Sequence, residues 1–158
     1  MSEMLIKAQE KLNSWQGHVN TEYKPKYHLS VPAGWLNDPN GFGFFQGKCH
    51  LFYQYHPYDT VWGPMHWGHW TSENLIDWEQ EPVAMAPDRE YDTAGCFSGT
   101  AIEDDGRYWI MYTGVIDEPS TGRTPQHQCL AWTDDGIHVE KAGENPVVGL
   151  DMTPEGTS

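Results

Sequence analysis

The first residues of the chain carry apolar side chains at the spacing of an α-helix. Leu5, Ala8, Leu12 and Trp15 follow one another at steps of three, four and three residues, so they share one helix face while charged and amide side chains lie off it. Gly17 follows this pattern directly and is a typical helix stop. The pattern predicts a helix over residues 3–17 and no other long helix.

From about Tyr27 onward the apolar positions change to the short runs of β-strands. The expected strands are 41–46, 49–55, 67–71, 77–81, 97–103, 108–114, 129–133 and 137–141. Gly47 and the run Asp104-Asp105-Gly106 mark tight turns between two pairs of them. The chain is therefore expected to form an all-β fold preceded by a short N-terminal α-helix.

The strands fall into two copies of one pattern. GFFQGKCHLFYQY resembles AIEDDGRYWIMYTG about sixty residues later, and HWTSENLIDWEQEPV resembles AWTDDGIHVEKAGENPV at a similar displacement. Four strands per copy are typical of β-propeller blades, with a β-sandwich as the alternative. A propeller closes with about 4–8 blades. Either the chain therefore belongs to a longer protein, as the loop-like ending DMTPEGTS suggests, or several copies assemble through their open blade faces.

The composition narrows the classes of molecule that the chain is expected to bind. With 23 acidic and 9 basic residues the formal net charge is −14, which argues against nucleic acid and against anionic membrane surfaces. The charge suits a neutral small molecule. An aromatic content of 13% suits a sugar, because a flat ring matches the C–H face of a furanose, although most of these rings are expected in the core.

The cysteines and the N-terminus indicate a compartment. Cys49, Cys96 and Cys129 lie far apart and are typical of small buried residues in a reducing environment. No apolar run approaches the ~20 residues of a membrane span, and the first residues lack the apolar stretch of a signal peptide. We expect a cytoplasmic protein.

The stretch Asn37-Asp38-Pro39-Asn40-Gly41 is a strong turn signal, and by pattern alone Asp38 is a turn residue. Polar and aromatic residues occur at corresponding edges of the two copies, however, and such groups around a concavity are what a sugar site needs. They are Trp35, Gln54, Trp62, Phe97 and Ser98. Asp38 is therefore also a candidate for chemistry.

Other kinds of site have little support. His66 and His69 would point to opposite faces of a strand, and His50 and His56 are likewise separate, so no zinc spacing exists. The chain has no glycine-rich phosphate loop, and Ser98 lacks the Gly-x-Ser-x-Gly context of a serine hydrolase. We expect neither a metal nor a cofactor.

Four motifs carry a resemblance to a known family. WLNDPNG, LFYQYHP, WGPMHWGHWTSENLIDWE and FSGTA occur here in the order and spacing of glycoside hydrolase family 32, which holds invertases, fructanases and sucrose-6-phosphate hydrolases. The resemblance covers residues 23–158, and the lead-in of residues 1–22 resembles bacterial cytoplasmic members. The family fold is a five-bladed β-propeller followed by a β-sandwich, so this chain would hold about the first two blades.

The resemblance also implies roles for particular residues. Asp38 is similar to the nucleophile of a retaining β-fructosidase that attacks C2 of the fructosyl unit. Seven further residues match positions that line the fructose subsite: Trp35, Leu36, Asn37, Gln54, Trp62, Phe97 and Ser98. The expected substrate is sucrose, sucrose-6-phosphate or a fructan, with sucrose and its phosphate leading.

Two motifs of the family are absent from the chain. An Arg-Asp-Pro motif supplies a carboxylate that grips the sugar, and a Glu-Cys motif supplies the general acid/base; neither occurs here. Nothing in the sequence singles out Glu73, Glu103 or Asp92 as a substitute, and turn or surface positions are expected for them. The chain is therefore expected to be inactive alone. The rival interpretations are a non-catalytic fructoside-binding module and a purely structural fragment.

Overall fold

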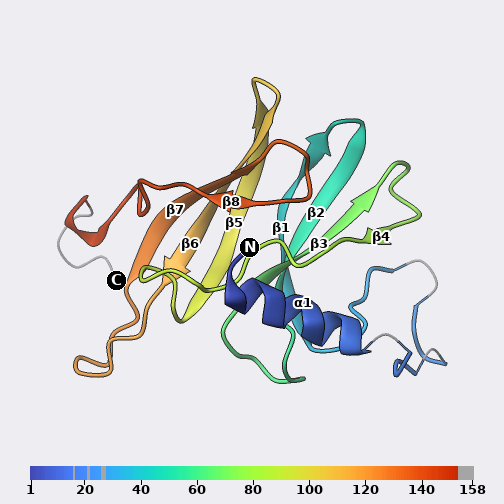
Figure 1. Ribbon diagram of the computed structural model, residues 1–158, viewed down its shortest axis with the longest axis horizontal. Coiled ribbons are helices and arrows are strands. Elements are labelled where there is room, and N and C mark those ends of the chain that lie inside the picture. The colour runs from blue at the N-terminus through green and yellow to red at the C-terminus, as the bar shows by residue number, and fades with distance from the viewer. Residues whose placement is uncertain (16, 21, 26–27, 153–158) are drawn as a thin grey trace.

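The computed structural model describes residues 1–15, 17–20, 22–25 and 28–152. These residues form a helix, α1 (Glu3–Trp15), then eight strands and a short 3-10 turn, η1 (Leu150–Met152). The fold is mostly β, as the sequence predicts, and the strands make two separate four-stranded antiparallel sheets (Figure 1). The loop expected at the end of the chain lies, from residue 153, outside the described residues.

Each sheet corresponds to one copy of the sequence repeat. The first sheet has the order β1 (Trp35–Phe45), β2 (Lys48–His56), β3 (His66–Ser72) and β4 (Glu79–Gln80). The second sheet has the order β5 (Gly95–Asp104), β6 (Arg107–Val115), β7 (Gln126–Thr133) and β8 (Glu140–Lys141). The prediction of four strands per repeat is therefore confirmed.

The last strand of each sheet is shorter than expected. The residues before β4 and β8 form loops in which one side chain caps two backbone amides. Asn74 Oδ1 accepts from the amides of Ile76 and Asp77, and Asp135 Oδ1 accepts from those of Ile137 and His138. These bonds compete with strand pairing, so the ladder begins only two or three residues later.

The first hairpin of each sheet closes with the same turn. Gln46 and Gly47 have φ of 49° and 79°, and Asp105 and Gly106 have φ of 50° and 76°. Two successive residues with positive φ make a type I′ turn, whose twist matches that of the flanking strands. Both turns lie at the same end of the molecule in Figure 1. The opposite end, where β1 and β5 begin and where the loop 57–65 joins β2 to β3, is called the site end below.

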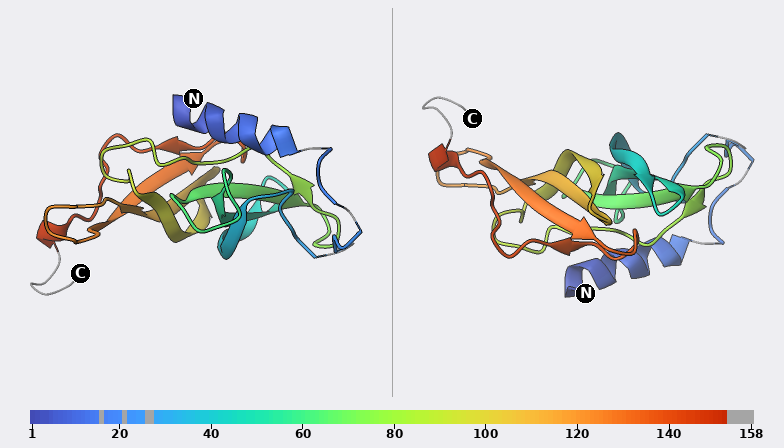
Figure 2. Two further views of the ribbon diagram at one scale, coloured as in Figure 1. Left: turned by 90° about the horizontal axis from the view of Figure 1, so that it is seen from below. Right: turned by 90° about the horizontal axis from the view of Figure 1, so that it is seen from above.

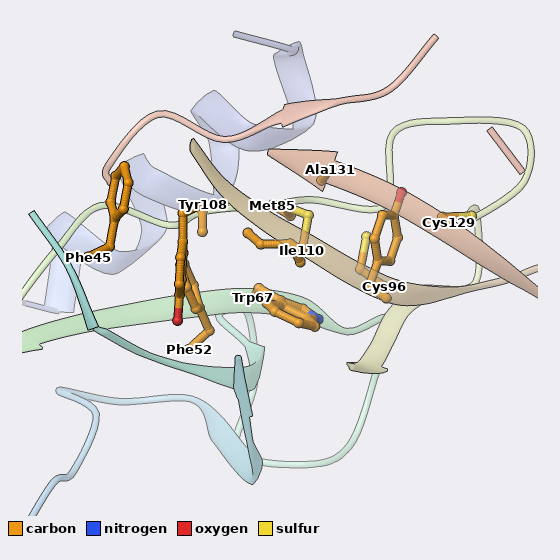
Figure 3. Packing of buried hydrophobic residues seen from close by; sticks show 11 residues of the cluster. Phe45, Phe52, Trp67, Met85, Cys96, Tyr108, Ile110, Cys129 and Ala131 are labelled. Atoms are coloured by element: carbon orange, nitrogen blue, oxygen red, sulfur yellow. The ribbon is translucent and has the colours of Figure 1, made fainter. Parts of the chain in front are cut away.

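The main core lies between the two sheets. Phe52 and Trp67 of the first sheet pack against Tyr108, Ile110 and Tyr112 of the second (Figure 3). Met85, from the segment that leads from β4 to β5, enters the same cluster. Burial of such large side chains is worth roughly 1.5–3 kcal/mol each, so this cluster fixes how the sheets face one another. All three cysteines of the chain are buried free thiols, as expected.

A second cluster joins α1 to the outer face of the first sheet. Ala8 and Leu12 are buried with Tyr53, Tyr55 and Trp70. The predicted helical face is thus confirmed, and the helix ends at Trp15, close to the expected stop at Gly17. Figure 2 shows α1 outside the sheets, on one side of the molecule. α1 is too short and too polar to cross a membrane, and the described residues contain no other helix that could.

A pair of histidines that the sequence did not indicate, His50 and His69, is buried beside the main core. His50 Nε2–H donates to the carbonyl of Phe45 at 3.3 Å, so His50 Nδ1 is free to accept from His69 Nε2–H at 3.0 Å. This assignment leaves His69 Nδ1 as a bare lone pair, which agrees with its lack of a partner. Burial lowers the pKa of both rings, so both are neutral.

One face of the second sheet is uncovered. Met111 occupies the repeat position of Phe52, yet Phe52 is fully buried and Met111 is exposed. Ile102, Trp109 and Trp132 form a row across β5, β6 and β7 on this uncovered face. The guanidinium of Arg107 lies 3.9 Å from the Trp132 ring and covers only part of the row.

The buried histidines should make the fold sensitive to acid. Burial lowers the pKa of His66 to about 4, against 6.5 for the unfolded chain. As pH falls below 6.5, His66 therefore becomes protonated in the unfolded chain but stays neutral in the folded chain until the pH is near 4. Stability should fall by about 3 kcal/mol through His66 alone between pH 6.5 and 4. Urea unfolding of the chain at a series of pH values checks this.

Two substitutions test whether His66 causes the loss: His66→Asn in the core, and His18→Asn outside it as the control. His66→Asn keeps a donor for the Pro64 carbonyl, which His66 Nδ1 contacts at 3.0 Å, but it cannot titrate. It should reduce the loss of stability between pH 6.5 and 4 by about 3 kcal/mol and leave the part that comes from His50 and His69, whereas His18→Asn, at an exposed position, should leave the loss unchanged. An unchanged slope in His66→Asn would contradict the assignment.

The uncovered face should make the 158-residue chain self-associate. Ile102 is 68% exposed in the row described above, and Ile76, in the β3–β4 loop, is also 68% exposed but lies off that face. Large exposed apolar patches mark association surfaces. We expect light scattering at micromolar concentration to detect oligomers that Ile102→Asp disrupts and Ile76→Asp does not. A compact monomer in the unsubstituted chain would refute this.

Candidate active site

Asp38 lies in a β-bulge rather than in a turn. Leu36 pairs with Tyr55 and Pro39 with Tyr53, so Asn37 and Asp38 together face only Gln54 on β2. The turn expected at residues 37–41 is wrong: the chain stays in the ladder, because β1 is an edge strand and an edge or bulge tolerates proline.

A second bulge, on β5 of the other sheet, lies against the first. Phe97 pairs with Thr113 and Gly99 with Tyr112, so Ser98 has no partner on β6. Ser98 Oγ–H instead donates to Asp38 Oδ2 at 2.7 Å, a short bond to a carboxylate. Asp38 itself is exposed at the site end. The two bulges thus hold one carboxylate in place while leaving it open to a ligand.

Aromatic residues gather at the same end of the sheets as this carboxylate. Trp62 in the loop 57–65 is 56% exposed and packs edge-to-face with Phe97, their centroids 6.1 Å apart. Trp35 Nε1–H donates to Asn37 Oδ1 at 2.9 Å, which orders the start of the bulge. Leu36 is partly exposed on the same stretch. An exposed acid at the end of the sheets that also carries the exposed ring of Trp62 and the half-buried rings of Trp35 and Phe97 is an arrangement suited to a sugar.

Gln54 has a structural contact that the sequence did not indicate. Its side chain is only 2% exposed, and its Nε2–H donates to the carbonyl of Cys96 at 3.0 Å. Gln54 therefore fixes β5 to the first sheet immediately before Phe97 and Ser98.

The contacts described above link the eight residues predicted for the site in small groups. These are Asp38 with Ser98, Trp62 with Phe97, Trp35 with Asn37, Gln54 with Cys96, and Leu36 in the β1 ladder.

Glu73 and Glu103 lie at the wrong end of the sheets to act with Asp38. Glu73 follows Ser72, which pairs with Cys49 near the first hairpin turn, and Glu103 pairs with Tyr108 near the second. Some seven strand residues, roughly 20 Å, separate Asp38 from its hairpin turn. Neither glutamate can share a bond-breaking site with Asp38.

Asp92 lies in a turn segment before β5, in agreement with the expected turn or surface position, but its side chain is fully buried. Lys141 Nζ lies 2.6 Å from Asp92 Oδ2 and 2.7 Å from Asp88 Oδ1, and Tyr112 O–H also donates to Asp92 at 2.8 Å. Burial by itself lowers the pKa of Lys141, but the negative groups around it, Asp92 and Asp88 among them, raise it above its ordinary value. Asp92 is therefore committed to an ion pair and is unavailable to a substrate.

The described residues contain no cluster of three or more histidine, cysteine or acidic side chains that could hold a metal ion. His66 and His69 contact different groups, as their spacing predicts: His66 packs edge-to-face on Tyr58, and His69 stacks on Phe52. The chemistry that this site offers rests on Asp38.

Comparison with known proteins identifies the family. The model of the glycosyl hydrolases family 32 N-terminal domain matches residues 28–158. The chain belongs to glycoside hydrolase family 32. The family resemblance carried by the motifs around Asp38 and Ser98 is thereby confirmed over residues 28–158.

The relatives of this family 32 chain are much longer than it is. A sucrose-6-phosphate hydrolase of Escherichia coli is 49% identical over 139 residues, which are 86% of this chain and 28% of the relative. A Bombyx mori GH32 β-fructofuranosidase, in a mutant form in complex with sucrose, matches with a TM-score of 0.87 and 41% identity over 98% of this chain and 32% of its own.

A third relative matches similar shares of the two chains. The structure of sucrose-6-phosphate hydrolase from Lactobacillus gasseri matches with a TM-score of 0.82 and 33% identity, covering 94% of this chain and 30% of that one. The chain thus spans about a third of the length of the family members it matches. Its two sheets correspond to part of their fold.

Proposed function

We propose that this chain supplies the nucleophile and part of the fructosyl subsite of a retaining β-fructofuranosidase that acts on sucrose or sucrose-6-phosphate. The observation that carries the proposal is the exposed Asp38 carboxylate, which Ser98 holds at 2.7 Å between two bulges. The sucrose-bound structure of a related enzyme supports the choice of substrate class.

In the proposed reaction Asp38 attacks C2 of the fructosyl unit, and the bond from C2 to the glycosidic oxygen breaks. A second carboxyl group, about 5–5.5 Å from the first, donates a proton to the departing oxygen. It then takes a proton from water, which hydrolyses the fructosyl ester and frees Asp38. The Ser98 hydroxyl keeps Asp38 pointed at C2, and the rings of Trp62 and Phe97 wall the sugar.

The acid/base group and the second sugar-gripping carboxylate are proposed to come from a longer protein, because the chain lacks both family motifs. The two sheets would then be the first two blades of a five-bladed propeller. The uncovered face of the second sheet agrees with this, since it repeats a face that the first sheet buries. We also propose that the protein is cytoplasmic, because its three cysteines are buried free thiols, which are typical of a reducing compartment.

Asp38→Asn in the longer protein should abolish hydrolysis of sucrose. An amide cannot form the fructosyl ester, so kcat should fall by about four orders of magnitude or more, while the fold stays intact. Asp59→Asn is the matched control, because Asp59 is an exposed aspartate in the loop 57–65 and loses the same charge. Glucose release, followed by a coupled assay, measures both. Turnover near the unsubstituted level in Asp38→Asn would exclude it as the nucleophile.

The 158-residue chain alone should not hydrolyse sucrose or its phosphate. Without a proton donor for the departing oxygen it loses at least the ~10²–10⁴-fold of general acid catalysis. Glucose release that accompanies the purified chain and disappears in Asp38→Asn would contradict this expectation. Calorimetric titration with fructose separates the rivals: binding without turnover fits a sugar-binding module, and no binding fits a fragment whose subsite needs further blades.

A further inference from the structure

Ser98 is held in place from the first sheet, not from its own. As the bulged residue of β5 it lacks a partner on β6, since Phe97 pairs with Thr113 and Gly99 already pairs with Tyr112. A bulged residue left to itself is free to tilt. Its 2.7 Å bond to Asp38 therefore depends on whatever fixes the two peptide groups on either side of it.

Both of those peptide groups are bound by side chains of the first sheet. The indole Nε1–H of Trp67 on β3 donates to the carbonyl of Phe97 at 3.2 Å. On the other side, the amide of Gly99 donates to Asn40 Oδ1 on β1 at 3.4 Å. Ser98 thus sits between two contacts that the second sheet does not make.

The two side chains are themselves rigid. Trp67 is fully buried, with its ring 5.7 Å from that of Phe52 and 6.4 Å from that of Tyr112. Asn40 is 3% exposed and lies only two residues after Asp38 on the same strand. The contacts therefore close a small ring that runs from Asp38 along β1 to Asn40, across to Gly99 and Ser98, and back to Asp38.

We propose that Trp67 and Asn40 are positioning residues, which fix the Asp38 carboxylate through Ser98. The catalytic part of this inference rests on the proposed function. If the bulge on β5 moved by about 1 Å, the Ser98 contact would be lost and the carboxylate could rotate away from C2. A misplacement of that size costs about 10²-fold in rate when groups must be aligned for attack.

Tryptophan-to-phenylalanine substitutions at two positions of β3 test the proposal. Trp67→Phe keeps an aromatic ring but removes the N–H that binds Phe97. Trp70→Phe is the matched control: Trp70 is also buried, and its indole N–H donates to Gln80 Oε1 at 2.8 Å, but it packs in the α1 cluster and does not reach β5. Both changes remove one buried indole and one hydrogen bond from the same strand.

The first readout needs no enzyme activity. Amide hydrogen exchange at Gly99 in the 158-residue chain is measured by NMR, as a ratio to exchange at Ile110 in the core of β6, so that a general loss of stability cancels. Trp67→Phe should raise the ratio about five- to tenfold, which is the loss of roughly one hydrogen bond, and Trp70→Phe should leave it unchanged. Equal ratios in the two variants would overturn the proposal.

The second readout is the kinetics of sucrose hydrolysis by the longer protein. Trp67→Phe should lower kcat about 10–100-fold and change KM by less than about threefold, whereas Trp70→Phe should leave kcat within about threefold. A raised exchange ratio with unchanged kcat would also overturn the proposal. A protein that hydrolyses no fructoside at all would refute the proposed function, while the exchange ratio would still decide whether Trp67 holds Ser98.

Asn40→Ala covers the case in which Trp67→Phe does not fold. It deletes the acceptor of the Gly99 amide and little else, so exchange at Gly99 relative to Ile110 should rise about fivefold or more and kcat should fall with KM nearly constant. An exchange ratio equal to that of the unsubstituted chain would exclude Asn40 from this role.

Discussion

The contact between the inner strands β1 and β5 is the constraint on which the site depends. Each is the edge strand of its sheet, and an edge strand presents backbone groups that no ladder satisfies. Here side chains of the opposite sheet satisfy several of them: Trp67 and Gln54 bind carbonyls of β5, and Tyr108 O–H donates to the carbonyl of Gly41 on β1 at 3.0 Å. The candidate nucleophile and the residue that holds it are therefore brought together only when the sheets pack.

Charged and polar groups in the interior keep that packing in one arrangement. Lys141 on β8 binds Asp88 and Asp92 and the carbonyl of Ala86, so it ties the last strand of the second sheet to the segment that leads into β5. A buried charge that loses its partner is strongly destabilising. Unlike apolar contacts, which tolerate sliding, these bonds fix the register in which β5 meets the first sheet.

The sequence predicts the regular parts of this structure well, because their signals are local. The spacing of Leu5, Ala8 and Leu12 determines the buried face of α1, and Gly47 and Gly106 mark the two hairpin turns. The bulge at Asp38 could not be predicted, since a turn and a bulge use the same residue types. Only the pairing of β1 with β2 distinguishes them: Leu36 pairs with Tyr55 and Pro39 with Tyr53, and this register is not contained in the residues around Asp38.

The contacts that sequence reasoning missed join residues far apart in the chain. The burial of Asp92 could not be predicted, because its partner, Lys141, lies 49 positions further on. His50 and His69 meet across two strands, and their contact follows from the β2–β3 register rather than from any spacing. Gln54 lies opposite Asp38 in the β1–β2 ladder, and its binding to Cys96 depends on how the two sheets pack.

The repeat explains why two bulges meet at one carboxylate. The β1 bulge lies opposite Gln54, and the β5 bulge lies beside Thr113, which is the corresponding residue of the second copy. The same irregularity was thus available in both sheets, and each copy uses it for a different side chain: an acid in the first and a hydroxyl in the second. Because neighbouring copies face each other, the second bulge is directed at the first. A repeated backbone feature therefore becomes an asymmetric site through a difference of side chains alone.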